Sequence, residues 1–471
     1  MDYISEKTFC KGLYIQNSIN YGYFILDSSK KTDIISLYRL KTPVIKEVTG
    51  MKKFLMIIGC ACIVAHIFAV GSTDGGNGAA SDKVQIRFLA MAQAAYSEQN
   101  VNDMTADFMK KHPNIVVQTE FVPYEELRNK TMLAYGSNNP YDAVLVDDIW
   151  YAEYAQKGII SDITAQVPES YKKGVLAGGW NFTTKKGKIV GLPWFLDCMY
   201  LFYNKNMLAR AGYTKGPATI EEMVEMAKAI KAKGICEYPF AFSLAQAEAL
   251  ICVYSNFLEA YGAEYQDKNG NWIVDKTGVK ALELLVQLKK DKLLNPNSTE
   301  YLEEDVRRVF SSGDCAFTMN WLYMYALASD PAESKLTKAQ VGISVLPGIK
   351  GGKKYAAMSG SMGLSVVSKT KHPKEALEYI LYLCSKEVQD KYSNLQLPVW
   401  TASYDDPAII AGKEELAATA KIAFNIMNAR PSVASYQEAS AVLQQYIQKA
   451  LYGELSPQEA LRKAVAEMSR M

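Results

Sequence analysis

Short apolar strand-like runs alternate with amphipathic helical segments from Lys83 onward, and this alternation constrains the fold more than any other feature. Residues 84–88 alternate apolar and polar side chains, as on a strand with one covered face. Residues 101–108 carry apolar side chains at helical spacing, and residues 115–121 predict the next strand. The run Ala-Val-Leu-Val at 143–146 is continuous, which is typical of a parallel strand covered on both faces. This rhythm predicts a doubly wound α/β fold.

Later segments carry start signals for helices. Residues 219–222 (Thr-Ile-Glu-Glu) have the sequence of a capping box, and residues 456–459 (Ser-Pro-Gln-Glu) repeat it with proline at the first helical position. Residues 372–375 (His-Pro-Lys-Glu) open another predicted helix. A chain of 471 residues is too long to fold around one ordinary hydrophobic core, and no long linker divides it after residue 82. The sequence therefore predicts two intertwined lobes.

Composition excludes some classes of protein. Apolar residues make up 49% and charged residues 22% of the chain, the balance of a globular protein. The net charge of +2 provides no basic field for nucleic acid, so that class of partner is not expected. Thirty tyrosines offer flat apolar faces with hydroxyl groups, which suit the binding of a half-polar molecule.

The first part of the chain reads as an export signal preceded by an extra segment. Residues 51–71 combine a basic start, an apolar stretch and a small-x-small cleavage site, which predicts a signal peptide and an extracytoplasmic or periplasmic location. Residues 72–82 form a polar linker. The apolar stretch is short and contains His66, which argues against a transmembrane anchor. The codons of residues 46–48 (Lys-Glu-Val) can spell a ribosome-binding sequence. We therefore hypothesise that residues 1–50 are leader read in frame; the alternative is a disordered extension.

The eight cysteines do not form a recognisable framework. Cys60 and Cys62 lie inside the apolar stretch rather than after it, so a lipid anchor is not favoured. No CxxC or Cys/His ligand spacing follows residue 82, so a zinc site is not expected. We expect the remaining five to be buried as small apolar side chains. They are Cys198, Cys236, Cys252, Cys315 and Cys384.

Acidic and aromatic residues meet at two predicted strand ends. Asp147 and Asp148 directly follow the strand at 143–146, and Trp150 comes two residues later. Trp194 and Asp197 lie at a second junction, which a proline breaks. Ligands of open α/β sheets bind beyond the carboxyl ends of strands. Carboxylates accept hydrogen bonds from hydroxyl pairs, and an indole packs on the C–H face of a sugar ring, so this combination favours carbohydrate binding.

Other interpretations of these residues remain open. Either aspartate can instead cap a helix, and Trp150 and Trp194 can belong to the core. Adjacent aspartates on extended backbone diverge, which is poor geometry for a pair of catalytic carboxylates. No GxSxG, GxGxxG or P-loop is present, so neither a serine nucleophile nor a nucleotide cofactor is expected.

From about Val84 to Met468 the chain resembles the family 1 extracellular solute-binding proteins, the maltose- and trehalose-binding type of ABC importer component. The resemblance rests on five segments that occur in the family's order. They are residues 142–148 (Asp-Ala-Val-Leu-Val-Asp-Asp), 191–204 with Gly-Leu-Pro and Tyr-Leu-Phe-Tyr-Asn, 310–321 with the pattern FxxGxxAF and a tryptophan, 359–363 (Ser-Gly-Ser-Met-Gly), and 430–453 with Arg-Pro and Leu-Tyr-Gly.

The resemblance implies a two-lobed periplasmic-binding-protein fold of type II, with lobes discontinuous in sequence and three hinge crossings. It places the N-terminal lobe at 83–197 and 348–388. The C-terminal lobe is expected at 198–347 and 389–471. The implied function is capture of a sugar by hinge closure, followed by delivery to ABC permease subunits, by a monomer that needs no cofactor or metal and is not an enzyme.

The resemblance also implies site residues. The aspartate after the strand is Asp147 or Asp148, the crossover carboxylate is Asp197, the stacking tryptophan is Trp321 and the late guanidinium is Arg430. The alternatives are a core role for Trp321, hinge stabilisation by Asp197 and a salt bridge between lobes for Arg430. Three further candidates are chosen by position: Ser361, Gln93 and Tyr96.

Maltose-type members often carry a second tryptophan in the glycine-rich return. Here Ser361 or Met362 occupies that place, so one aromatic wall is expected to be missing. This leaves room for a monosaccharide, a polyol or another oligosaccharide. Two rival functions come from other classes: a secreted glycoside hydrolase, and a binding protein for a non-sugar solute such as a peptide or polyamine.

Overall fold

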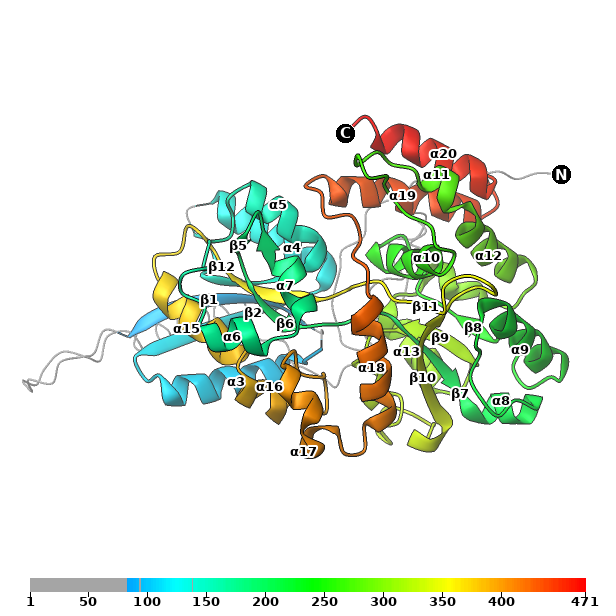
Figure 1. Cartoon of the computed structure of the whole chain (residues 1–471), viewed down its shortest axis with the longest axis horizontal. Coiled ribbons are helices and arrows are strands. Elements are labelled where there is room, and N and C mark those ends of the chain that lie inside the picture. The colour runs from blue at the N-terminus through cyan, green and yellow to red at the C-terminus, as the bar shows by residue number, and fades with distance from the viewer. Residues whose placement is uncertain (1–82, 93–94, 138) are drawn as a thin grey trace, which may run out of the picture. The chain divides into compact units, whose positions relative to one another are not determined.

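The computed structural model describes residues 83–92, 95–137 and 139–471. These residues form two α/β lobes, each built around its own five-stranded sheet. In Figure 1 the elements of the first sheet lie on the left and those of the second sheet on the right. The leader, signal-peptide and linker predictions for residues 1–82 lie outside the described residues.

The first lobe contains a mixed sheet with the strand order β2-β1-β3-β12-β6. β1 pairs in parallel with both β2 and β3, whereas β12 is antiparallel to β3 and β6. The strands are β1 (Val84–Met91), β2 (Ile115–Val122), β3 (Ala143–Asp147), β6 (Leu192–Phe195) and β12 (Met362–Val366). β12 is inserted between β3 and β6, although about 165 residues of chain separate it from β6.

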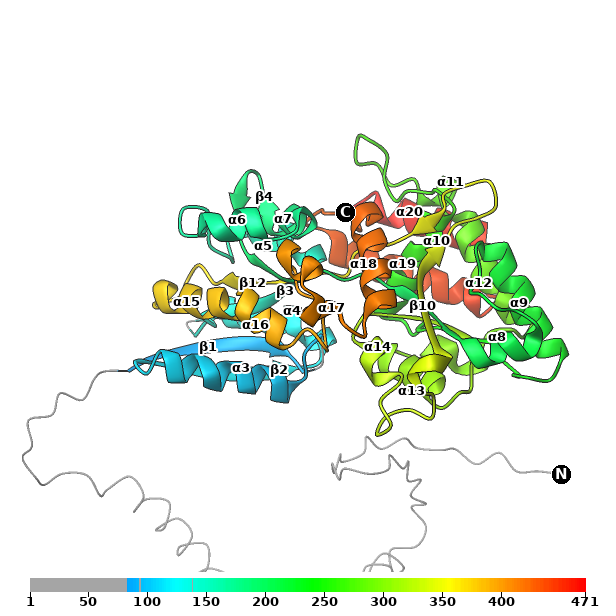
Figure 2. The same cartoon turned by 60° about the horizontal axis from the view of Figure 1, so that its bottom comes forward.

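Helices cover this sheet, and their starts follow from local sequence. Ser97 caps the first helix with a full capping box, and Thr105 of that helix lies 2.7 Å from the hydroxyl of Tyr379 on α15, so the two helices pack side by side (Figure 2). The helices of this lobe are α3 (Glu98–Lys111), α4 (Tyr124–Gly136), α5 (Tyr151–Gln156), α6 (Glu169–Gly174), α7 (Ala177–Thr183), α15 (Pro373–Leu383) and α16 (Lys386–Lys391). A short 3-10 helix, η1 (Asp148–Trp150), follows β3, and the hairpin β4 (Thr184–Lys185) and β5 (Lys188–Ile189) follows α7.

The second lobe has the strand order β11-β10-β7-β9-β8. Its strands are β7 (Tyr200–Asn204), β8 (Phe240–Ala241), β9 (Phe317–Asn320), β10 (Val341–Pro347) and β11 (Tyr355–Ala356). Its helices are α8 (Lys205–Ala211), α9 (Ile220–Ala232), α10 (Glu248–Ala260), α11 (Val274–Thr277), α12 (Val279–Lys290), α13 (Glu303–Ser311), α14 (Met324–Leu327), α18 (Glu414–Ile426), α19 (Tyr436–Leu451) and α20 (Pro457–Met468). The short helices η2 (Pro296–Glu300) and η3 (Lys338–Gln340) complete it, and η4 (Thr401–Asp405) and α17 (Pro407–Ile410) lead into α18.

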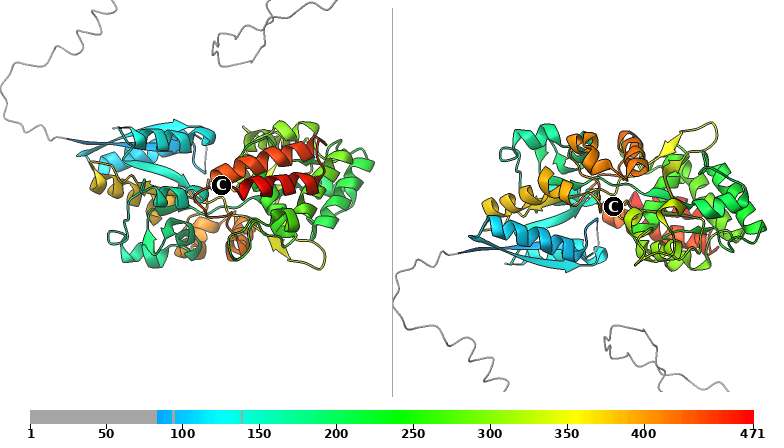
Figure 3. Two further views of the ribbon diagram at one scale, coloured as in Figure 1. Left: turned by 90° about the horizontal axis from the view of Figure 1, so that it is seen from above. Right: turned by 90° about the horizontal axis from the view of Figure 1, so that it is seen from below.

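The predicted helix starts of this lobe are confirmed. The hydroxyl of Thr219 accepts the backbone N–H of Glu222 at 3.1 Å, and that of Ser456 accepts Glu459 N–H at 3.2 Å. The last two helices, α19 and α20, lie side by side and pack against α12 (Figure 3). All five cysteines predicted to be buried are buried, and none of them forms a disulfide. Within the described part of the chain, no helix has the length and apolarity needed to cross a membrane.

Three segments cross between the lobes, and they are hydrogen-bonded to one another. Cys198 in the first crossing forms a bridge with Ser359 in the second. Met358 in the second crossing pairs in turn with Asn428, which follows α18. This side-by-side arrangement forms a hinge and agrees with the predicted type II fold with three crossings.

The lobe boundaries differ from the prediction at two places. Residues 348–361 were assigned to the first lobe, but Tyr355 and Ala356 pair with β10 and extend the second sheet. Residues from 389 onward were assigned to the second lobe, but Val399 and Trp400 are buried in the core of the first. In both cases the chain crosses later than the expected boundary, because strand pairing and core packing continue beyond it.

Candidate functional site

A cleft of about 320 Å³ opens between the two lobes. The first lobe contributes the ends of β1, β2 and β3 and the start of α4, and the second contributes α10, α13 and the loop after β9. The lining includes six carboxylates and three phenol or indole side chains, of which Tyr124 comes from the first lobe and Trp321 and Tyr323 come from the second. The polar and aromatic members are Tyr124, Glu125, Asp147, Asp197, Glu248, Glu303, Glu304, Trp321, Tyr323 and Arg430.

Asp147 lies where β3 ends and η1 begins. Its carboxylate accepts the backbone N–H of Ile149 at 3.2 Å, so it caps the short helix, and it also accepts the hydroxyl of Tyr124 at 3.0 Å. Both interpretations of this residue therefore hold, since Asp147 is a cap and lines the cleft. Burial raises its pKa, and the neighbouring Asp148 acts in the same direction, whereas Arg430 opposes the rise.

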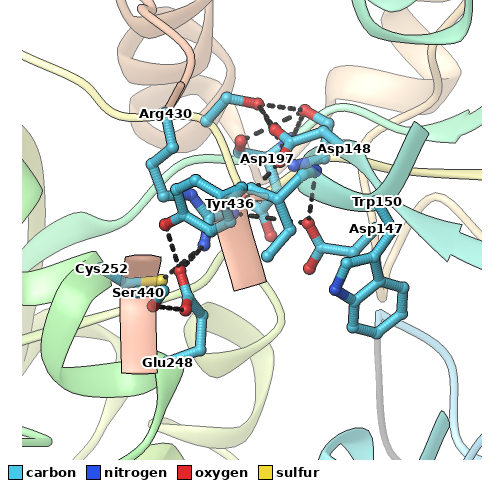
Figure 4. Close-up of polar contacts among 12 residues, drawn as sticks. Asp147, Asp148, Trp150, Asp197, Glu248, Cys252, Arg430, Tyr436 and Ser440 are labelled. Atoms are coloured by element: carbon cyan, nitrogen blue, oxygen red, sulfur yellow. Dashed lines mark hydrogen bonds and ion pairs between the residues drawn. The ribbon is translucent and has the colours of Figure 1, made fainter. Parts of the chain in front are cut away.

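Arg430 joins the two lobes through a buried ionic network (Figure 4). Its Nη2 lies 3.2 Å from Asp148 and 3.4 Å from Asp147 in the first lobe. Its Nη1 lies 2.6 Å from Glu248 on α10 of the second lobe. The guanidinium side chain is only 1% exposed, yet the residue borders the cleft. Arg430 therefore forms the salt bridge between lobes that was expected as the alternative to ligand contact.

Glu248 anchors the second-lobe end of this network. Its carboxylate accepts hydrogen bonds from the hydroxyls of Tyr436 and Ser440, both on α19. At the other end, the hydroxyl of Ser359 donates to Asp148. One cation and several hydroxyls thus hold these carboxylates, which fixes their positions beside the cleft.

Asp197 occupies the first hinge crossing. Its carboxylate accepts the backbone N–H of Cys198 at 2.9 Å and of Leu322 at 3.2 Å, which ties the hinge to the loop after β9. Its own backbone N–H donates to the hydroxyl of Ser361 at 3.1 Å. Burial raises the pKa of Asp197, and the two N–H donors oppose that rise. Asp197 therefore has the hydrogen bonds expected of a residue that stabilises the hinge, and it also borders the cleft.

Trp321 is the indole that borders the cleft, in the loop after β9. Its Nε1–H donates to Glu303 at 3.4 Å, and its backbone N–H donates to the side chain of Asn320 at 2.8 Å. Burial raises the pKa of Glu303 to about 7, and the charges of Glu125 and Glu248 contribute. The residue is partly exposed and lines the cleft.

Other predicted site residues lie elsewhere. Trp194 is 2% exposed and stacks near Tyr96, which is 1% exposed, with ring centroids 5.2 Å apart in the core of the first lobe. Trp150 is buried beneath the cleft wall, where it stacks on Tyr124 and donates to Gln437 at 3.0 Å. These three residues do not line the cleft because apolar packing encloses their rings.

Two predicted residues support the cleft from behind, and one is not described. Asp148 and Ser361 are buried and hydrogen-bond to residues of the cleft wall rather than lining it. Gln93 lies outside the described residues. The prediction that no aromatic ring occupies positions 361 and 362 holds by sequence, and Met362 borders the cleft there.

Sequence reasoning missed several cleft residues. Tyr124 and Glu125 follow β2 directly after Pro123, so the strand-end rule that found Asp147 could have found them. Glu248 and Glu303 begin α10 and α13, and no strand end marks them. Only the packing of the second lobe brings these two carboxylates to the cleft.

Comparison with known proteins adds independent information. The family model for bacterial extracellular solute-binding proteins matches residues 92–390. A probable ABC transporter-binding protein of Deinococcus radiodurans is 26% identical over 351 residues, which cover 70% of this chain and 80% of that protein. A diacetylchitobiose-binding protein, DasA, of Streptomyces coelicolor is 24% identical over 72% of this chain and 79% of its own length.

The fold is also similar to solved structures. The maltose-bound MalE3 protein of T. maritima superposes with a TM-score of 0.75 at 30% identity, and the match covers 82% of this chain and 99% of that one. A solute-binding protein of Agrobacterium radiobacter in complex with ribitol gives a TM-score of 0.76 at 22% identity, covering 83% of this chain and 99% of that one. The second match bears on the fold alone.

Proposed function

Because the chain belongs to the bacterial extracellular solute-binding protein family, we propose that its interlobe cleft captures a carbohydrate for an ABC importer. The observation that carries the proposal is the pairing of a partly exposed indole, Trp321, with carboxylates from both lobes in one cleft. Indole faces pack on the C–H side of sugar rings, and carboxylates accept their hydroxyl groups. The sugars named for MalE3 and DasA point to the same class of ligand.

The proposed mechanism is closure about the three-segment hinge. A ligand in the cleft contacts both lobes, so it binds the closed arrangement better than the open one and shifts the population toward it. A micromolar dissociation constant corresponds to about 8 kcal/mol, which permits both capture and release. The closed monomer is then the form that membrane permease subunits recognise, because closure fixes the relative orientation of two surfaces.

Binding rather than catalysis fits carboxylates that hydrogen bonds hold in fixed positions. Asp197 is held by two backbone N–H groups, and Asp147 is held by Tyr124, Ile149 and Arg430. Groups fixed in this way serve as hydrogen-bond acceptors for ligand hydroxyls. A rival hydrolase would be favoured if reducing sugar were released from oligosaccharides and the release were abolished by Asp197→Asn.

The experiment is a thermal-shift screen followed by calorimetry. Maltose, diacetylchitobiose, ribitol and tagatose are tested against a peptide mixture and polyamines. We expect at least one sugar or polyol to raise Tm in a concentration-dependent manner and to be recovered chemically unchanged. If only the peptides or polyamines shift Tm, the non-sugar rival is correct.

We also propose that residues 51–71 direct export and are removed, without a lipid anchor. The expectation is tested by mass spectrometry of the protein recovered from cells of the source bacterium. The mature protein should begin within about ten residues of Gly71. Tryptic peptides from residues 1–45 would show instead that the leading segment is translated.

A further inference from the structure

Gly360 lies in the second hinge crossing and borders the cleft beside Trp321. A Cβ atom at position 360 would lie 2.2 Å from Cζ3 and 2.3 Å from Cη2 of the Trp321 indole. Contacts this short do not occur between a real Cβ and a ring, so the backbone of Gly360 lies directly against the indole. Gly360 is not among the glycines with positive φ. Glycine is therefore required here by space and not by backbone conformation.

The indole has little freedom to move away from this contact. Its Nε1–H is directed to Glu303 at 3.4 Å, and the backbone of Trp321 is fixed by Asn320 at 2.8 Å. The next residue, Leu322, donates its N–H to Asp197 in the first crossing. Gly360 itself donates its backbone N–H to the carbonyl of Asp197 at 3.0 Å. Both sides of the contact are thus tied to the same hinge residue.

We propose that Gly360 is a positioning residue of the binding site, whose missing side chain lets the hinge backbone lie against the Cζ3–Cη2 edge of the Trp321 indole and so fixes the position of the ring in the cleft. The proposal rests on the proposed sugar-binding function.

The first test needs no ligand. The protein is labelled with 5-fluorotryptophan, and the ¹⁹F resonance of Trp321 is identified by its absence in Trp321→Phe. In Gly360→Ala we expect this resonance to move, because the added methyl displaces the ring. The matched control is Gly178→Ala in α7, where a Cβ would lie 3.9 Å from the methyl groups of Leu196, an ordinary contact. A Trp321 resonance that is identical in Gly360→Ala and wild type overturns the proposal.

The second test measures affinity for whichever of maltose, diacetylchitobiose, ribitol or tagatose gives the largest thermal shift. We expect Gly360→Ala to weaken binding about tenfold, while Gly178→Ala changes it less than about twofold. In a Trp321→Ala background, Gly360→Ala should lower the affinity by less than about a further twofold, because its effect acts through the indole. An equal loss in both backgrounds contradicts the proposal. If none of these probes binds, the proposed function fails, while the ¹⁹F measurement still decides the role of Gly360.

Discussion

The Nη1 atom of Arg430 lies 2.6 Å from Oε1 of Glu248, a pair in which both side chains are at most 6% exposed. The same guanidinium reaches Asp148 of the first lobe at 3.2 Å. The contact therefore joins helix α10 of the second lobe to the end of β3 in the first. Because the charges are buried, removal of one partner leaves the others without compensation.

We predict that Arg430→Gln lowers the free energy of unfolding by about 3–5 kcal/mol, the cost of leaving buried carboxylates unpaired. The measurement is chemical denaturation at neutral pH. The control is Lys463→Ala, which removes an exposed pair with Glu459 and should change stability by less than about 0.5 kcal/mol. Equal effects of the two substitutions would contradict a structural role for the buried network.

Trp321→Ala should weaken sugar binding at least about tenfold, on the order of 1.4 kcal/mol, because the ligand loses its stacking surface. Calorimetry with the sugar identified by thermal shift measures the change. Trp180→Phe serves as the control, since Trp180 packs against the core of the first lobe and does not line the cleft. Unchanged affinity in Trp321→Ala would remove this residue from the site.

Glu303 gives the stability a pH dependence with a defined sign. Burial raises its pKa from 4.5 to about 7 in the folded protein, so the folded state binds more protons than the unfolded state between these values. The loss of stability that comes from ionising the buried Glu303 is absent below pH 4.5 and grows as pH rises. It is complete above about pH 7. Glu303→Gln should therefore have a Tm close to wild type at about pH 5 and a higher Tm at about pH 8. A Tm difference between variant and wild type that is the same at both pH values would show that the pKa of Glu303 is not raised.

Trp194→Phe should reduce stability but leave sugar affinity unchanged. Trp194 is 2% exposed in the first-lobe core, and its Nε1 has no hydrogen-bond partner among the residues that the structure describes, so we expect the substitution to remove mainly apolar contacts. We expect a loss of about 1–2 kcal/mol by denaturation. Affinity should stay within about twofold, because the residue lies outside the cleft. Tighter or weaker binding beyond that range would place Trp194 in the site after all.

The strands and helix starts could be predicted from sequence because they depend on local patterns. The alternation at 84–88, the apolar run at 143–146 and the caps at Thr219 and Ser456 each act within a few residues of chain. The family resemblance supplied the hinge and the lobes. The limits of the lobes were less accurate, because Tyr355 and Trp400 are placed by pairing and packing with distant segments.

The site could be predicted only in part, for the same reason. Asp147 and Asp197 were found because they follow strands, and both border the cleft. Trp194 also follows this pattern, but its ring points into the core, since alternation along a strand does not reveal which face is covered by the other elements. Glu248 and Glu303 come from helix starts in the other lobe, and their approach to the cleft depends on contacts between segments far apart in sequence.

The position of β12 in the first sheet has a consequence for synthesis. This strand (Met362–Val366) fills the gap between β3 and β6, and it leaves the ribosome only after the strands of the second lobe. Until then the first sheet lacks a central member, and closing so long a loop is slow. The first lobe therefore stays without a complete core for most of the elongation of the chain.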